Sequence, residues 1–164
     1  MLTKETGKLK LAAMGDREIV MTREFNAPRK LLFDAWTKPE LLKRWLAGPE
    51  GWTMTLCEID LEVGGSYRYE WTHQNGQKMG MGGVYREIVP AERIVATEKF
   101  DESWYPGGAI VTTTLNEKGG VTTVETTVTY DSQEARNGVL RSPMDTGVAA
   151  SYDRLEGLLA TNFA

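Results

Sequence analysis

The stretch Ser142-Pro-Met-Asp-Thr-Gly-Val-Ala-Ala-Ser-Tyr-Asp-Arg-Leu-Glu-Gly-Leu-Leu159 decides the fold, because it predicts the one long amphipathic helix of the chain. Ser142 is a favourable N-cap residue and Pro143 suits the first helical position. A helix from about Pro143 to Leu159 would be roughly 25 Å long, enough to cross most of a domain of this size. Its expected stripe comprises Met144, Val148, Ser151, Tyr152, Leu155, Leu158 and Leu159.

Upstream of this helix, short β-prone runs are separated by turn residues. Asn75-Gly76 is the strongest turn signal, because both residues tolerate the positive φ of a tight hairpin. Short turns require consecutive strands to pair antiparallel. Seven strands are therefore expected, over residues 17–25, Thr53–Asp60, Ser66–His73, Lys78–Ile88, Arg93–Phe100, Ala109–Leu115 and Val121–Tyr130.

Two short helices are expected after the first strand. Pro28 suits the first turn of one of them, whose apolar stripe ends at Trp36. Thr37 and Glu40 have the spacing of a capping box that would begin the second helix, whose apolar side includes Trp45.

These elements predict an α+β fold in which a curved antiparallel sheet wraps around the C-terminal helix, since a sheet with one apolar face must cover it. Residues 16–164 are expected to form a single domain, and residues 1–15 a flexible N-terminal arm. Residues 131–141 connect the last strand to the helix, with a short helical turn at Ser132–Arg136.

Composition excludes several classes of function. The 164 residues carry a formal net charge of −4 and no strongly basic stretch, which argues against nucleic acid as a partner. No apolar run approaches the roughly 20 residues that span a bilayer, and no signal peptide is recognised, so we expect a cytoplasmic protein without a membrane partner.

No metal or cofactor is expected. The chain has one cysteine, Cys57, and one histidine, His73, which lie too far apart in sequence for a structural zinc site. The glycines at 80, 82 and 83 lie within a predicted strand and do not form a phosphate-binding loop.

An apolar cavity is expected between the sheet and the C-terminal helix. Aromatic and methionine side chains share one side of their strands, opposite a helix that carries the small residue Gly147, which would allow close approach or leave space. The alternative is that these residues only fill a core. The expected lining comprises Trp36, Trp45, Tyr67, Tyr69, Trp71, Met79, Met81, Tyr85, Met144, Val148 and Tyr152.

Acid–base chemistry has two candidate groups in strands. Either Glu98 or Asp60, if turned inward, would have a raised pKa and could act as a general base. His73 lies next to the Asn75-Gly76 turn, where we expect it to be solvated. The sequence assigns no catalytic residue.

Four ordered motifs resemble the SRPBCC (START-like) superfamily, and more closely its bacterial branch related to the C-terminal domain of the activator of heat-shock-protein-90 ATPase. They are Arg23-Glu-Phe-Asn-Ala-Pro-Arg-Lys-Leu-Leu-Phe-Asp-Ala-Trp-Thr-Lys-Pro-Glu-Leu-Leu-Lys-Arg-Trp45, Cys57-Glu-Ile-Asp-Leu-Glu-Val-Gly-Gly65, Gly83-Val-Tyr-Arg-Glu-Ile-Val-Pro-Ala-Glu-Arg93 and Met144-Asp-Thr-Gly-Val-Ala-Ala-Ser-Tyr-Asp-Arg-Leu155. The resemblance implies a helix-grip fold with seven strands and two short helices after strand one. Trp45-Leu46 departs from the pair of tryptophans that many members carry.

Three functions follow from the pattern and the resemblance together. The first is binding of a small hydrophobic or amphipathic ligand in the cavity. The second is a protein-interaction module like the chaperone activator, and a homodimer or other protein partner is an associated expectation. The third is a cyclase- or hydrolase-like enzyme that uses the same cavity.

Overall fold

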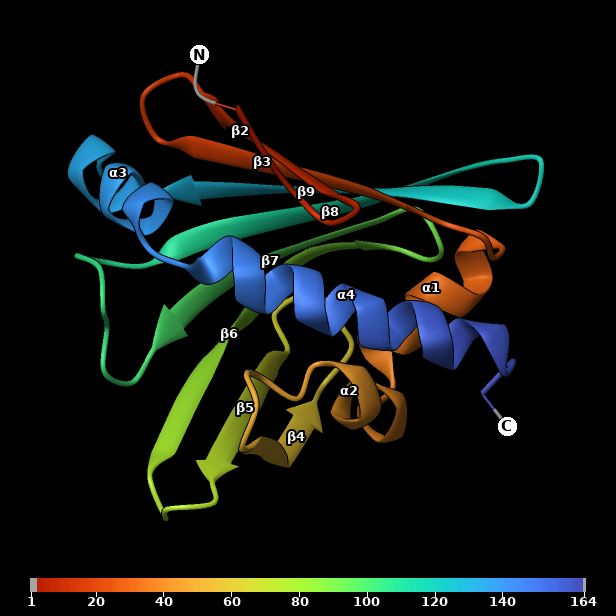
Figure 1. The fold of residues 1–164 in the computed structure, drawn as a ribbon, viewed down its shortest axis with the longest axis horizontal. Coiled ribbons are helices and arrows are strands. Elements are labelled where there is room, and N and C mark those ends of the chain that lie inside the picture. The colour runs from red at the N-terminus through yellow and green to blue at the C-terminus, as the bar shows by residue number, and fades with distance from the viewer. Residues whose placement is uncertain (1–2, 164) are drawn as a thin grey trace.

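An antiparallel sheet curves around helix α4 in the computed structural model, which describes residues 3–163 (Figure 1). The strands are β1 (Thr3–Thr6), β2 (Leu9–Met14), β3 (Glu18–Phe25), β4 (Trp52–Ile59), β5 (Ser66–His73), β6 (Lys78–Val89), β7 (Arg93–Phe100), β8 (Ala109–Lys118) and β9 (Val121–Tyr130). The helices are α1 (Arg29–Thr37), α2 (Pro39–Trp45), α3 (Gln133–Arg141) and α4 (Met144–Ala160).

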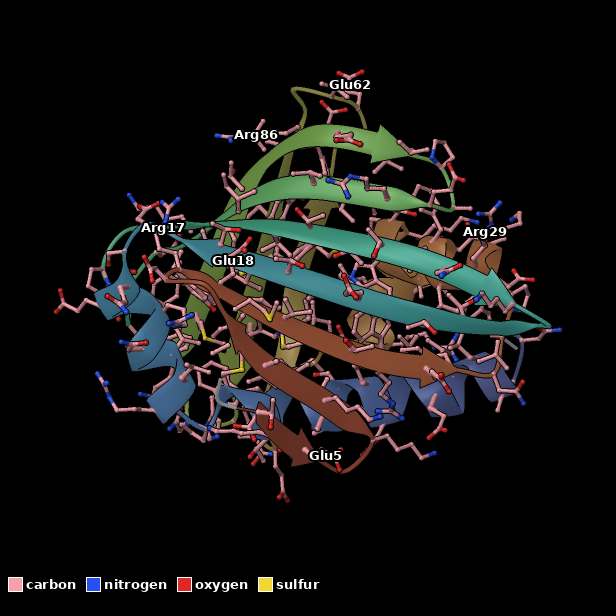
Figure 2. The ribbon with its side chains drawn as sticks, turned by 90° about the horizontal axis from the view of Figure 1, so that it is seen from above. Glu5, Arg17, Glu18, Arg29, Glu62 and Arg86 are labelled. Atoms are coloured by element: carbon pink, nitrogen blue, oxygen red, sulfur yellow. The ribbon has the colours of Figure 1, made fainter. Side chains whose placement is uncertain are left out.

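The strand order across the sheet is β1-β2-β3-β9-β8-β7-β6-β5-β4, and all neighbours pair antiparallel. The seven predicted strands are present as β3 to β9, and the α+β class is confirmed. Figure 2 shows the sheet from its outer face, with α1, α2 and α4 behind it. The helices therefore cover the concave face, where the apolar core lies.

The sheet has nine strands and not the predicted seven, because residues 3–14 form β1 and β2 where a flexible arm was expected. Leu9 and Leu11 alternate with exposed residues and are buried, so this hairpin extends the core along β3. Gly7 and Gly15 supply the positive φ at the two turns. Residues 1–2 of the expected arm lie outside the described residues.

Helices α1 and α2 follow β3 as expected, but their junction differs from the prediction. Thr37 does not cap α2; its hydroxyl donates to the Phe33 carbonyl at 2.7 Å, because Thr37 is still the last residue of α1. Lys38 occupies the cap position and Pro39 begins α2. The indole N–H of Trp45 donates to the Ala35 carbonyl at 3.0 Å and ties the two helices together.

Helix α3 is a full helix of nine residues where only a short turn was expected. The Ser132 hydroxyl accepts a hydrogen bond from the Ala135 amide at 3.1 Å, so the predicted start is correct. Arg136 of this helix is buried, and its guanidinium donates hydrogen bonds to the carbonyls of Gly15 and Glu18. This arginine therefore anchors α3 to the turn between β2 and β3.

Helix α4 begins one residue later than predicted, with Pro143 at its N-cap. The buried guanidinium of Arg23 in β3 pairs with two exposed carboxylates of this helix, Asp153 at 2.8 Å and Glu156 at 3.2 Å. Leu155 is fully buried. Within residues 3–163 no helix has the length and hydrophobicity that crossing a membrane requires.

Candidate functional site

A cavity of about 140 Å³ lies between the inner face of the sheet and the two short helices. Helix α1 contributes Trp36, and Leu42 and Leu46 come from α2 and the residue that follows it. Four strands supply the rest of the lining: Tyr67, Tyr69, Met81, Tyr85, Ile94, Ala96, Glu98, Val111 and Thr113.

The strand residues meet in the cavity because alternate side chains of a strand share a face. Tyr67 and Tyr69 of β5 stand side by side, with ring centroids 4.9 Å apart. Tyr85 of β6 lies 5.4 Å from Tyr67 and continues the same aromatic wall. Burial is the main cause that raises the pKa of all three phenols, and that of Tyr85 rises to about 12. All three hydroxyls are therefore neutral at ordinary pH.

The aromatic wall is fixed by a close approach between β6 and β7. The Tyr67 hydroxyl donates to the Thr97 carbonyl at 2.6 Å. Gly83 of β6 lies against this same peptide, and a Cβ there would lie 2.6 Å from the Thr97 carbonyl carbon and closer still to its oxygen. A glycine at 83 is thus required where the two strands form the cavity wall.

Glu98 is the only carboxylate among the described residues that line the cavity. Burial raises the pKa of Glu98 to about 7, and the neighbouring Tyr105 hydroxyl partly opposes this rise. The negative charge of Glu98 in turn adds to the raised pKa of Tyr67, Tyr105 and Tyr130, for which burial is the larger cause. A single ionisable group therefore titrates near neutral pH inside an otherwise apolar and phenolic space.

Five residues of the predicted lining come together in the cavity, and they are Trp36, Tyr67, Tyr69, Met81 and Tyr85. The other six lie elsewhere. Trp45 and Tyr152 do not line the cavity but contact Trp36, with ring centroids 4.7 Å and 5.8 Å from it. Trp71 donates its indole N–H to the Leu46 carbonyl at 2.9 Å, beside the cavity.

The remaining predicted residues also lie outside the cavity. Met144 and Val148 of α4 are partly buried and pack against the core. Met79 faces a separate outer groove. Among the described residues, none from α4 lines the cavity, so its roof is α1 and α2 and not the C-terminal helix as predicted.

Sequence reasoning missed the small and aliphatic part of the lining, which comprises Leu42, Leu46, Ile94, Ala96, Val111 and Thr113. The alternation of Ile94, Ala96 and Glu98 along β7 was the available signal. Of the two candidate carboxylates, Glu98 lines the cavity, whereas Asp60 is exposed at the end of β4.

The other reactive groups do not form a site. Burial raises the pKa of the Cys57 thiol to about 11, so it stays protonated and is a poor nucleophile. His73 lies at the β5–β6 turn, where its Nδ1 accepts a hydrogen bond from the Asn75 amide at 3.1 Å. Residues 3–163 contain no group of three or more His, Cys, Asp or Glu side chains that could hold a metal ion.

A larger groove of about 440 Å³ lies on the outside, by the ends of β5, β6 and β7. Three of its charged residues, Arg68, Glu70 and Asp101, pair with each other. Arg68 binds both carboxylate oxygens of Asp101, at 2.8 Å and 2.6 Å, and Glu70 at 3.0 Å, so the pKa of Asp101 is lowered. The inner cavity is the better candidate site, because its lining is mainly aromatic and aliphatic with few polar groups.

Comparison with known proteins agrees with this architecture. A crystal structure of a Rhodobacter sphaeroides protein is similar, with 31% identity, a TM-score of 0.89, and coverage of 94% of this chain and 99% of that one. A Chromobacterium violaceum protein has 31% identity, a TM-score of 0.70, and coverage of 87% and 96%. An AHSA1-like protein from Aeromonas hydrophila shares the fold, with 17% identity, a TM-score of 0.68, and coverage of 88% and 95%.

A search of curated proteins found no match. The model of one family matches residues 26–160, which include the four helices and strands β4 to β9. The resemblance that the sequence motifs indicated is therefore confirmed. The chain belongs to the family of Activator of Hsp90 ATPase homolog 1-like proteins.

Proposed function

We propose that the protein binds a small apolar or amphipathic molecule, about the size of one six-membered ring, in the cavity beneath α1 and α2. The observation that carries this proposal is a space of about 140 Å³ lined by aromatic and aliphatic side chains with few polar groups. Ligand sites usually have that composition. An apolar cavity of about 150 Å³ holds one benzene molecule.

The volume restricts the ligand. Sites for drug-sized molecules usually measure about 300–1,000 Å³, which is well above the space found here. We therefore expect a ring with one short substituent to fit and a long-chain fatty acid to be excluded. The phenol groups and Glu98 give such a ligand an amphipathic environment, with polar atoms at one part of an apolar wall.

Benzyl alcohol is a suitable probe, and an Ala96→Leu variant tests the location. Ala96 is buried and lines the cavity, so a leucine there would occupy the space that the probe needs. We expect wild type to bind benzyl alcohol in calorimetric titration and the variant to lose at least about tenfold in affinity.

Val95→Leu is the matched control, because Val95 is the next residue of β7 and its side chain points to the other face of the sheet. It should bind benzyl alcohol like wild type. If no small aromatic probe binds wild type, or if Ala96→Leu binds as well as Val95→Leu does, the proposal is wrong.

The inward carboxyl group of Glu98 favours a second candidate, an acid–base enzyme of the hydrolase or cyclase kind that uses the same cavity. A pKa of about 7 for Glu98 suits a group that exchanges protons near neutral pH. Hydrolysis of phenyl acetate by wild type and its loss in Glu98→Gln would support this candidate. Equal rates in the two proteins would exclude it.

A further inference from the structure

The cavity combines two features that favour a positively charged ligand. Its aromatic wall consists of Trp36, Tyr67, Tyr69 and Tyr85, whose ring faces carry negative electrostatic potential. Its only formal charge is the carboxyl group of Glu98, and no Lys, Arg or His is present among the described lining residues. An anionic ligand would meet a like charge and no cationic partner in this space.

We propose that the cavity selects a small organic cation, such as a protonated amine on a single ring, over a neutral molecule of the same shape. The inference rests on the proposed function, since it names the chemical class of the ligand of the same cavity. The ammonium group would lie beside the Glu98 carboxylate and the ring would lie against the aromatic wall.

Two interactions stabilise such a complex. A cation over a tyrosine or tryptophan face is attracted by the negative potential of the ring, and the attraction is stronger where water is excluded. An N–H donated to a carboxylate is a charge-assisted hydrogen bond and is about twice as strong as a neutral one. Moving the ammonium out of water is unfavourable, so the partner carboxylate must be ionised for the cation to bind well.

The charged and titratable groups around Glu98 also favour a positively charged ligand. The phenols near it come from β5, the β7–β8 loop and β9, and burial raises the pKa of each, so they stay neutral: Tyr67, Tyr105 and Tyr130. Tyr69 and Tyr85, on the cavity wall, are neutral for the same reason. Asp131 also raises the pKa of Tyr105, so a second negative charge lies near the phenols that surround Glu98.

The pH dependence follows from the protonation of Glu98. Burial raises the pKa of Glu98 to about 7 in the empty cavity, so about half of the molecules are protonated at that pH. A cation binds the ionised form, lowers the pKa and releases the proton. Cation affinity should therefore fall about tenfold from pH 8 to pH 6, while the affinity of a neutral probe should hardly change.

The experiment compares benzylamine with benzyl alcohol, which have the same shape and differ in charge. Benzylamine is protonated throughout this pH range. At pH 8 we expect wild type to bind benzylamine at least about tenfold more tightly than benzyl alcohol. Glu98→Gln should lose this preference for benzylamine over benzyl alcohol, and it should lose the pH dependence of benzylamine binding.

Glu125→Gln is the control for the loss of one negative charge, because Glu125 is exposed on β9 and lies outside the cavity. It should keep the preference and the pH dependence. Equal affinity of wild type for the two probes at pH 8, or a preference that survives in Glu98→Gln, would overturn the inference and leave the proposed function standing. Failure of both probes to bind wild type would overturn both.

Discussion

At the scale of single residues, Glu98 couples stability to pH. Its ordinary pKa is 4.5 and burial raises it to about 7, so the folded protein favours the protonated form. The penalty for ionising it is absent below pH 4.5, grows as the pH rises, and is complete above pH 7. That penalty is about 3 kcal/mol at most.

Replacing Glu98 with glutamine should remove this penalty. In urea unfolding, we expect the free energy of unfolding of Glu98→Gln relative to wild type to increase from pH 5 to pH 8. The increase should be up to about 3 kcal/mol. The comparison across pH cancels any effect of the substitution that does not depend on protonation. A difference between the two proteins that is the same at both pH values would show that Glu98 is not buried as described.

Replacement of glycine by alanine should have opposite effects on stability at two positions, Gly83 and Gly147. Gly83→Ala would drive a methyl group into the Thr97 peptide and separate β6 from β7, at a cost of about 3 kcal/mol. Gly147→Ala meets no atom within 4 Å and lies in the interior of α4, so it should stabilise the protein by up to about 1 kcal/mol. Thermal unfolding of both variants measures the two signs, and destabilisation by Gly147→Ala would contradict the second.

Gly147 and Glu98 also show how far single positions can be interpreted from sequence. Gly147 was expected to allow a close approach or leave space, and its open surroundings exclude the close approach. The sequence left open whether Glu98 or Asp60 points inward. Strand alternation places side chains on two opposite faces, but it does not say which face is the inner one until the pairing of the strand is known. The pairing of Glu98 with Ala109 supplies that register.

At the scale of elements, the hairpin β1–β2 is the main addition to the predicted fold. Leu9 and Leu11 alternate with polar residues, but the run is short and lies between glycines, so the local sequence pattern predicts an arm. The two leucines are 1% and 4% exposed, and β2 pairs with β3 along five residues. A short strand of this kind is stabilised by its neighbour, and the neighbour cannot be seen in a local pattern.

Leu11→Ala tests whether the hairpin belongs to the core. Removing a buried leucine should lower the free energy of unfolding by about 3 kcal/mol. Lys10→Ala, at the adjacent exposed position of β2, should change it by less than about 0.5 kcal/mol. If Leu11→Ala has an effect as small as Lys10→Ala, the first strands do not pack as described and the arm is the better description.

At the scale of the whole molecule, the sequence predicted the sheet, the helices and a cavity lining of which five residues meet, but it assigned the roof to α4. The long helix is the strongest amphipathic signal, so it was expected to cover the sheet alone. In the structure Tyr152 of α4 meets Trp36, Trp45 and Phe25 in an aromatic layer, and none of the described residues that line the cavity comes from α4. Whether α4 or the pair α1 and α2 covers the cavity depends on how side chains pack between these helices. The hydrophobic periodicity of each helix does not contain that information.

If the cavity binds a ligand as we propose, we expect Trp36 to limit the size of that ligand. Its side chain lines the cavity and also contacts Trp45 and Tyr152. Trp36→Ala should enlarge the cavity toward α4 and lower the stability by about 3 kcal/mol. The variant should bind 2-naphthylmethanol, a two-ring probe that wild type excludes, as measured by calorimetric titration.

Trp104→Ala provides the matched control, because Trp104 is 49% exposed in the outer groove and does not line the cavity. It should bind benzyl alcohol and exclude 2-naphthylmethanol, as wild type does. If wild type already binds the two-ring probe, the cavity is not limited by Trp36. If Trp36→Ala stays folded but excludes this probe, the aromatic layer under α4 has collapsed into the space, and Tyr152 and Trp45 take over the role of the missing ring.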